Sequence, residues 1–150
     1  MSDNFLRLIP TDPEYTPDAQ AADEARAYLA TLVPDADEVK AAMTSEVTFI
    51  DQGTNLERIS CPRCGAELDE SWWADEVERA SNTAFTQLDV TTPCCAARVS
   101  LNDLDYEWPA GFARFVLEAM NPQVRDLDES ATARLATMLG TPLRRIWAHY

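Results

Sequence analysis

Short apolar runs separated by turn residues predict several strands in the first hundred residues. The runs combine leucine, valine, isoleucine and phenylalanine and are bounded by proline, glycine, asparagine or aspartate, which is typical of strands. They lie at residues 5–9, 47–50, 56–60, 85–90 and 98–101. A further segment, residues 38–43, fits a strand or a helical turn equally well.

Two segments between these runs have the apolar spacing of amphipathic helices. From Thr16 to Leu32 alanine and leucine recur at helical intervals, and Thr16 followed by Pro17 has the residue types of an N-cap and a first helical position. A second helix is expected from Asp69 to Ala80, with Asp69 as its N-cap.

The last forty residues predict mainly helix. The first stripe with helical spacing is Phe112, Phe115, Val116, Ala119 and Met120. Asp126 and Glu129 match a capping box for a further helix that ends at Gly140. Residues 143–150 fit a final helix or strand.

Composition and charge narrow the functional classes. The 150 residues are 46% hydrophobic and 25% charged, as in an ordinary folded domain, but 26 acidic against 12 basic side chains leave a net charge of −14. Phosphates and anionic headgroups require a basic surface, so we expect neither nucleic acid nor a membrane as partner. The chain shows neither an apolar run of about 18 residues nor a basic leader with an apolar stretch, and we expect it in the cytoplasm.

The acidity is concentrated in one part of the chain. Residues 1–110 contain 22 acidic and 7 basic residues, whereas residues 111–150 contain 4 acidic and 5 basic ones. Solubility alone would account for an acidic surface. The functional interpretation is an acidic face that attracts a basic protein.

The first of two cysteine pairs lies in the sequence Cys61-Pro62-Arg63-Cys64-Gly65. Two thiolates three residues apart reach one metal ion only if the backbone between them turns tightly. The proline presets φ for such a turn, and the glycine tolerates a left-handed conformation after it.

The second pair, in Thr92-Pro93-Cys94-Cys95, departs from this spacing. When Pro93 is aligned with Pro62, Thr92 stands at the place of the first ligand and Cys95 at the place of the second. Cys95 is therefore the more regular ligand. Cys94 can reach the same ion through an altered turn; otherwise His149 or an acidic side chain would complete the set.

Together the two turns resemble the CPxCG knuckles of zinc-ribbon proteins. The resemblance covers only these short segments. It implies a structural Zn²⁺ bound by Cys61, Cys64, Cys94 and Cys95, which leaves no open position for catalysis. A redox-active dithiol and a disulfide between the adjacent cysteines are the alternatives.

The order strand–helix–strand–strand–helix–strand over residues 5–90 resembles a split βαβ, ferredoxin-like unit with the zinc knuckles at its corners. We therefore expect an α+β fold with a small antiparallel sheet and C-terminal helices. Residues 1–110 would form the α+β body with the inserted knuckles, and residues 111–150 a helical segment packed on the same domain.

Aromatic and acidic residues are interleaved at two places. Such a mixture suits a binding hot spot for an arginine-bearing protein, although the same rings could instead cover the zinc knuckles or the C-terminal helices. The candidate partner-binding residues are Trp72, Asp103, Asp105, Tyr106 and Trp108.

Sequence motifs for catalysis are missing. The chain has no glycine-rich phosphate loop, no G-x-S-x-G and no H-E-x-x-H, and His149 is its single histidine. We expect a non-enzymatic, zinc-stabilised acidic protein-binding domain, comparable to bacterial immunity proteins and antitoxins that block basic toxins. The alternative is an enzyme or redox protein that uses the cysteines, and a weaker alternative is a nucleic-acid-associated zinc ribbon.

Overall fold

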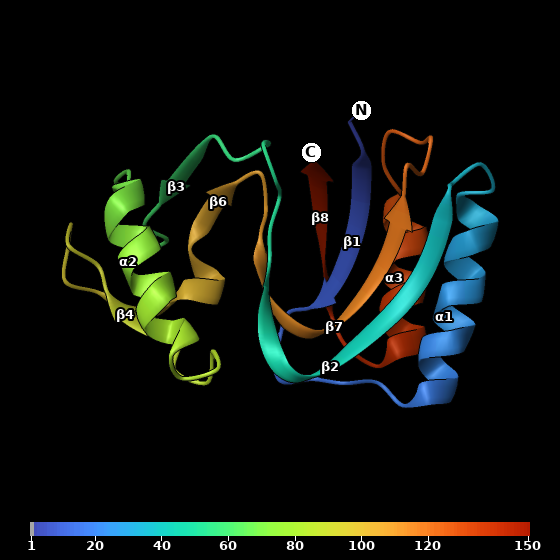
Figure 1. Cartoon of the computed structure of the whole chain (residues 1–150), viewed down its shortest axis with the longest axis horizontal. Helices are drawn as coiled ribbons and strands as arrows, with labels where there is room; N and C mark the ends of the chain where they lie inside the picture. The colour runs from blue at the N-terminus through green and yellow to red at the C-terminus, as the bar shows by residue number, and fades with distance from the viewer. Residues whose placement is uncertain (1) are drawn as a thin grey trace.

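A helix-covered sheet and an inserted segment make up the computed structural model, which describes residues 2–150 (Figure 1). Four antiparallel strands form the sheet, in the order β2-β7-β1-β8. They are β1 (Asn4–Pro10), β2 (Glu38–Ile50), β7 (Gly111–Met120) and β8 (Leu143–His149). Helices α1 (Ala19–Leu32) and α3 (Glu129–Leu139) lie side by side on one face of this sheet.

The connectivity β1-α1-β2 followed by β7-α3-β8, with β1 and β7 at the centre, is that of a split βαβ unit. The predicted α+β class is confirmed. The second half of the unit, however, is β7-α3-β8 and not the segments between residues 56 and 90. Those segments belong to an insert, residues 51–110, that leaves the sheet after β2 and returns to it at β7.

The insert consists of two short two-stranded sheets, one helix and a 3-10 turn, and it forms the left half of the molecule in Figure 1. In one sheet β3 pairs with β6, and in the other β4 pairs with β5. The bounds are β3 (Arg58–Ser60), α2 (Glu70–Ser81), β4 (Asp89–Thr91), β5 (Arg98–Ser100), η1 (Leu101–Asp103) and β6 (Asp105–Glu107). Strands of three residues add little stability by themselves, so the insert depends on other interactions.

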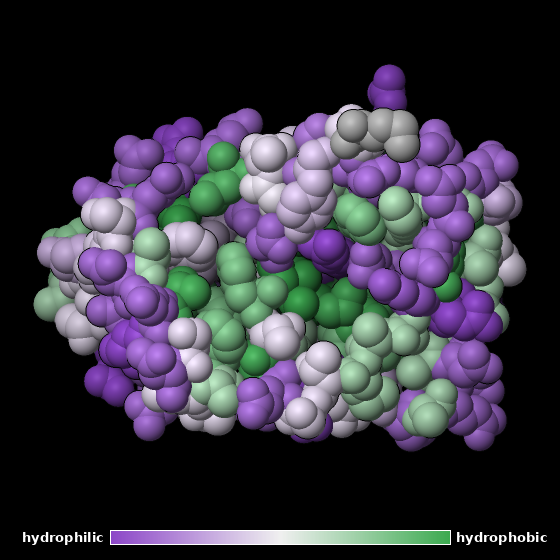
Figure 2. Space-filling model, in the orientation of Figure 1, coloured by the Kyte–Doolittle hydropathy of each residue, from purple (hydrophilic) through white to green (hydrophobic). Residues whose placement is uncertain are grey.

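Two main hydrophobic clusters fill the two halves. The cluster between the sheet and its helices is centred on fully buried leucine, phenylalanine and alanine side chains. Its central members are Leu6, Leu8, Ala25, Leu29, Phe115, Leu117, Leu135 and Leu139. A second cluster lies within the insert and reaches the sheet at Val47 and Phe112. Figure 2 shows further hydrophobic residues in the hollow between the two halves, framed by hydrophilic ones.

Residues 111–120 form strand β7 and not the predicted helix. This strand pairs with β1 on one side and with β2 on the other. The helices cover one face of it, while on the other face Phe112 packs against the insert. Beyond Phe112 this second face is only half-buried, but its apolar residues Val116 and Met120 combine with Phe115 and Ala119 of the helix-covered face into helical spacings. The predicted C-terminal helical segment is thus reduced to α3, since residues 143–149 are strand as well.

Several element boundaries differ from the predictions. The N-cap of α1 is Asp18 and not Thr16. Residues 38–50 form one continuous strand with a bulge between Met43 and Thr48. Most of the predicted strand 85–90 is turn, and only its last residues belong to β4. The N-cap at Asp69 and the left-handed Gly140 after α3 are confirmed.

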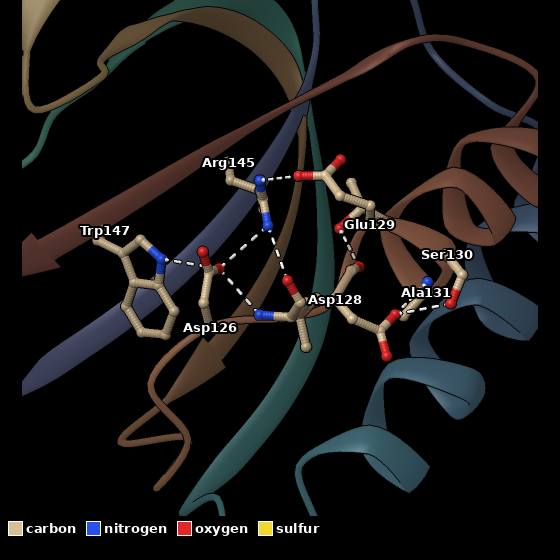
Figure 3. A network of polar contacts seen from close by, with 9 residues as sticks. Asp126, Asp128, Glu129, Ser130, Ala131, Arg145 and Trp147 are labelled. Carbon is tan, nitrogen blue, oxygen red and sulfur yellow. Dashed lines mark hydrogen bonds and ion pairs between the residues drawn. The ribbon is translucent and has the colours of Figure 1, made fainter.

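Asp128 and not Asp126 is the N-cap of α3, because Asp126 is used elsewhere (Figure 3). Its carboxylate accepts a hydrogen bond from Trp147 Nε1 at 3.3 Å and forms an ion pair of 3.3 Å with Arg145. Arg145 also donates to the carbonyl of Leu127 at 2.8 Å. These contacts tie the loop before α3 to strand β8.

A polar junction joins the insert to the sheet. Arg144 on β8 donates to the carbonyl oxygens of Asn102 at 2.8 Å and Ala110 at 2.9 Å. The Asn102 side chain in turn accepts from the backbone N–H of Phe112 and donates to the carbonyl of Thr11. The end of the insert that leads into β7 is therefore held close to the sheet by hydrogen bonds that are buried or half-buried.

We predict that Arg144→Met lowers the free energy of unfolding by about 2 kcal/mol, because two half-buried carbonyls lose their donor. Urea denaturation measures this loss. The control is Arg26→Met on α1, whose guanidinium has an exposed ion pair with Asp23 at 3.3 Å and should change stability by less than about 0.5 kcal/mol. Equal effects of the two substitutions would show that the junction is not structural.

Candidate metal centre

The four cysteine thiols converge on one point. All four Sγ atoms lie within 4.8 Å of one another. Cys64 Sγ is 3.3 Å from Cys94 Sγ, and Cys61 Sγ is 3.8 Å from Cys95 Sγ. Four sulfurs at about 2.3 Å from a tetrahedral zinc ion are about 3.8 Å apart, so the cluster has the dimensions of a single four-coordinate metal site.

The first knuckle is a tight turn that follows β3. The N–H of Cys61 donates to the carbonyl of Ala66 at 2.9 Å, and the N–H of Gly65 donates to the carbonyl of Cys61 at 3.0 Å. Gly65 has a φ of +77°, which a glycine adopts without a steric penalty. This turn brings the two thiols of Cys61 and Cys64 to the same side of the backbone.

The second knuckle, between β4 and β5, repeats these hydrogen bonds. The N–H of Thr92 donates to the carbonyl of Ala97 at 2.9 Å, and the N–H of Ala96 donates to the carbonyl of Thr92 at 3.0 Å. Ala96 has a φ of +56° at the place of Gly65. The backbone therefore aligns Thr92 with Cys61 and Cys95 with Cys64, as the sequence predicts.

Cys94 joins the cluster although it occupies the turn position of Arg63. Its Sγ lies beside that of Cys64, which completes a set of four thiols. His149 is not part of this set, because its Nδ1 is hydrogen-bonded to Asn4 Oδ1 at 2.7 Å on the sheet. The donors that converge are thus the four cysteines and not three cysteines with a histidine.

Thr92 supports the cluster, a role that the sequence analysis did not assign to it. Its Oγ1 lies 3.5 Å from Cys95 Sγ and accepts the N–H of Ala97 at 3.2 Å. A hydroxyl that accepts one hydrogen bond can still donate another, so the Thr92 hydroxyl can donate its proton to the Cys95 sulfur. The side chain is almost fully buried. The signal in the sequence is its alignment with Cys61 in the repeated knuckle.

Hydrogen bonds to sulfur favour ionised thiols at two positions. The backbone N–H groups of Cys64 and Arg63 point at the Cys61 sulfur and lower the pKa of this thiol to about 6. The Thr92 hydroxyl, with the N–H of Ala97, lowers the pKa of Cys95. Thiolates are the form of cysteine that binds metal.

At Cys64 the neighbouring sulfur atoms disfavour the thiolate form. The N–H of Ala66 favours its thiolate, but the neighbouring sulfurs, Cys94 first among them, raise its pKa to about 11. A second negative charge is therefore resisted once the first thiolate has formed. A divalent cation among the four sulfurs removes this repulsion, so the cluster has the donor set and the electrostatics of a metal site.

The predicted partner-binding residues divide into buried and exposed ones. Tyr106 is only 6% exposed. Its hydroxyl donates to the carbonyl of Leu101 at 2.6 Å and accepts from Trp73 Nε1 at 3.1 Å. Its ring lies in the core of the insert, where it has no access to a partner. Trp72 is half-buried against the same cluster.

Asp103, Asp105 and Trp108 are exposed. Asp103 lies 3.9 Å from Arg144, at the edge of the junction with the sheet. Asp105 has no basic side chain within 4.0 Å among the residues that the structure describes. The exposed fraction of Trp108 is 42%. Of the predicted set, Asp105 and Trp108 are thus the residues with the most freedom to contact another molecule.

Comparison with known proteins adds no relative: no family model, no curated protein and no solved structure matches the chain. None of the helices within residues 2–150 has the length and hydropathy to cross a lipid bilayer. The functional argument therefore rests on the cysteine cluster and on the surface of the insert.

We predict that metal removal loosens the insert and leaves the sheet folded. The insert depends on the cysteine cluster, whereas the sheet has its own buried core. Hydrogen–deuterium exchange measured with and without a strong chelator should show faster exchange for residues 58–107 and unchanged protection in β1 and β7. Identical exchange of the insert in both samples would contradict a structural metal.

We predict that Thr92→Val lowers zinc affinity about tenfold, because the Cys95 thiolate loses its hydroxyl donor. Competition with a chromogenic chelator measures the affinity. Thr92→Ser keeps the hydroxyl and should bind zinc like the natural protein. Thr91→Val, at the exposed neighbouring position, should have no effect. An unchanged affinity in Thr92→Val would remove Thr92 from the site.

Proposed function

We propose that this chain is a zinc-stabilised, non-enzymatic domain that binds a basic protein through the acidic surface of its insert. Zinc is the proposed ion because soft thiolates in a tetrahedral arrangement suit it better than magnesium or calcium, which prefer oxygen ligands. Four protein sulfurs fill its coordination sphere, so it would stabilise the insert without activating water.

The observation that carries the proposed binding function is a set of exposed carboxylates in the insert without basic neighbours. Among the described residues, none of them has an arginine, lysine or histidine nitrogen within 4.0 Å. They are Glu57, Glu67, Asp69, Glu70, Asp75, Glu78 and Asp105. Uncompensated charge on one side of a molecule accelerates association with a partner of opposite charge.

Blockade of a basic protein is the proposed biological use. An acidic domain of this size can cover the phosphate-binding surface of a basic toxin such as a nuclease, as bacterial immunity proteins and antitoxins do. The net charge of −14 supports this use and opposes a nucleic acid as the direct ligand.

A redox function of the cysteines is the second candidate, and the lowered pKa of Cys61 favours it. The same thiol is only 2% exposed, which restricts attack on a substrate. Iodoacetamide distinguishes the two candidates: a redox protein reacts rapidly at one cysteine while folded, whereas a zinc site protects all four.

We predict that the protein isolated from its own host carries one zinc ion per chain and a basic protein, as measured by native mass spectrometry. Raising the salt concentration should weaken the complex, because exposed charges are screened. Glu70→Gln with Glu78→Gln on α2 should weaken it further.

The control pair, Glu24→Gln with Asp35→Asn, removes the same charge from the helix-covered side of the molecule and should have little effect. A partner that is acidic, or a complex that is indifferent to salt and to the α2 substitutions, would contradict the proposed function.

A further inference from the structure

Trp108 is an exposed ring on a well-held backbone. It directly follows β6, and its carbonyl accepts a hydrogen bond of 3.0 Å from the side chain of Gln52, which is itself 3% exposed. Trp108 lines two neighbouring cavities, of about 570 and 700 Å³. An exposed tryptophan beside two concave surfaces is typical of a binding hot spot.

The smaller cavity carries one uncompensated negative charge. In the two-stranded sheet of β3 and β6, Arg58 is opposite Glu107, and Ser60 is opposite Asp105. Arg58 Nε lies 3.0 Å from the Glu107 carboxylate, so these two charges compensate each other. Asp105 is opposite a serine and has no basic side chain within 4.0 Å among the described residues, and it lines the same cavity as Trp108.

The larger cavity, on the other side of Trp108, is balanced in charge. Its lining contains the arginine Arg125 and the carboxylate Asp126, which have opposite signs, and His149 is its other ionisable side chain. The surface around Trp108 therefore combines an aromatic face, one free carboxylate and space for a chain to continue past the ring.

We propose that this surface is a slot for an arginine side chain of the basic partner. The guanidinium would lie against the indole of Trp108 and donate hydrogen bonds to the carboxylate of Asp105. This inference rests on the proposed function, since it names the contact through which the acidic insert recognises its partner.

Arginine fits this slot better than lysine for two reasons. Its planar guanidinium stacks on an aromatic ring and loses little hydration when it does so, whereas the ammonium of lysine is compact and strongly hydrated. The fork of N–H donors also matches a carboxylate in a bidentate arrangement. A purely electrostatic acidic surface would not distinguish the two residues, and this difference provides the test.

The experiment titrates the zinc-loaded protein with two capped peptides of equal charge, hexa-arginine and hexa-lysine, by isothermal calorimetry at low salt. We expect hexa-arginine to bind about fivefold more tightly. Trp108→Leu should abolish this preference and leave the binding of hexa-lysine nearly unchanged. Asp105→Asn should weaken hexa-arginine more than Asp35→Asn does, which removes an equal charge from the loop after α1.

A second measurement needs no variant. In nitrogen-15 spectra the indole N–H signal of Trp108 should shift on addition of hexa-arginine, while that of Trp73, which is bonded to Tyr106 in the core, should not. Far-UV circular dichroism and the zinc content show whether each variant is folded.

The possible results distinguish a failure of the proposed arginine slot from a failure of the proposed function. If both peptides bind equally, or if Trp108→Leu keeps the preference for arginine, the proposed arginine slot is wrong. The proposal that the insert binds a basic protein through its acidic surface is then unaffected. If neither peptide binds at low salt, the proposed basic partner is wrong as well. A shift of Trp108 that hexa-lysine reproduces in full would also overturn the preference for arginine.

Discussion

Four sulfur atoms within 4.8 Å of one another are the constraint on which the insert depends. Its strands are only three residues long, and two-stranded sheets of this length are not stable alone. The two knuckles place their thiols so closely that several negative charges repel each other unless a cation is bound. A metal ion would therefore stabilise the fold of residues 51–110. It would also hold strand β6 in place, which contains Asp105 and is followed by Trp108.

The sheet and the insert have separate hydrophobic cores and meet at a polar junction. The sheet with α1 and α3 buries its own core, while the insert has a separate cluster and joins the sheet through Arg144, Asn102 and Phe112. Residues 51–110 contain 12 acidic and 4 basic side chains, and the surface around Trp108 adjoins the junction. The insert between β2 and β7 of the split βαβ unit thus contains the cysteine cluster and the proposed binding surface.

Local signals were predictable from the sequence, whereas long-range pairing was not. Asp69, Gly140 and the aligned knuckles are defined by neighbouring residues, and the structure confirms them. The strand at 111–120 has helical spacings because its half-buried outer face carries apolar Val116 and Met120, next to Phe115 and Ala119 of the helix-covered face. For Tyr106 the sequence leaves partner binding and burial as alternatives, because it cannot show that Trp73, 33 positions earlier, bonds the Tyr106 hydroxyl.

Charge and shape contribute differently to recognition. Four thiolates around a divalent zinc ion leave a net charge of −2, so a zinc-loaded insert would be more acidic than the formal −14 of the chain implies. Such a field accelerates encounters with any basic protein but selects poorly among them, since it acts over distance and is screened by salt. Selectivity requires a short-range contact that depends on geometry. The proposed slot would supply such a contact, because a planar guanidinium can stack on the indole of Trp108 and donate hydrogen bonds to the Asp105 carboxylate at the same time.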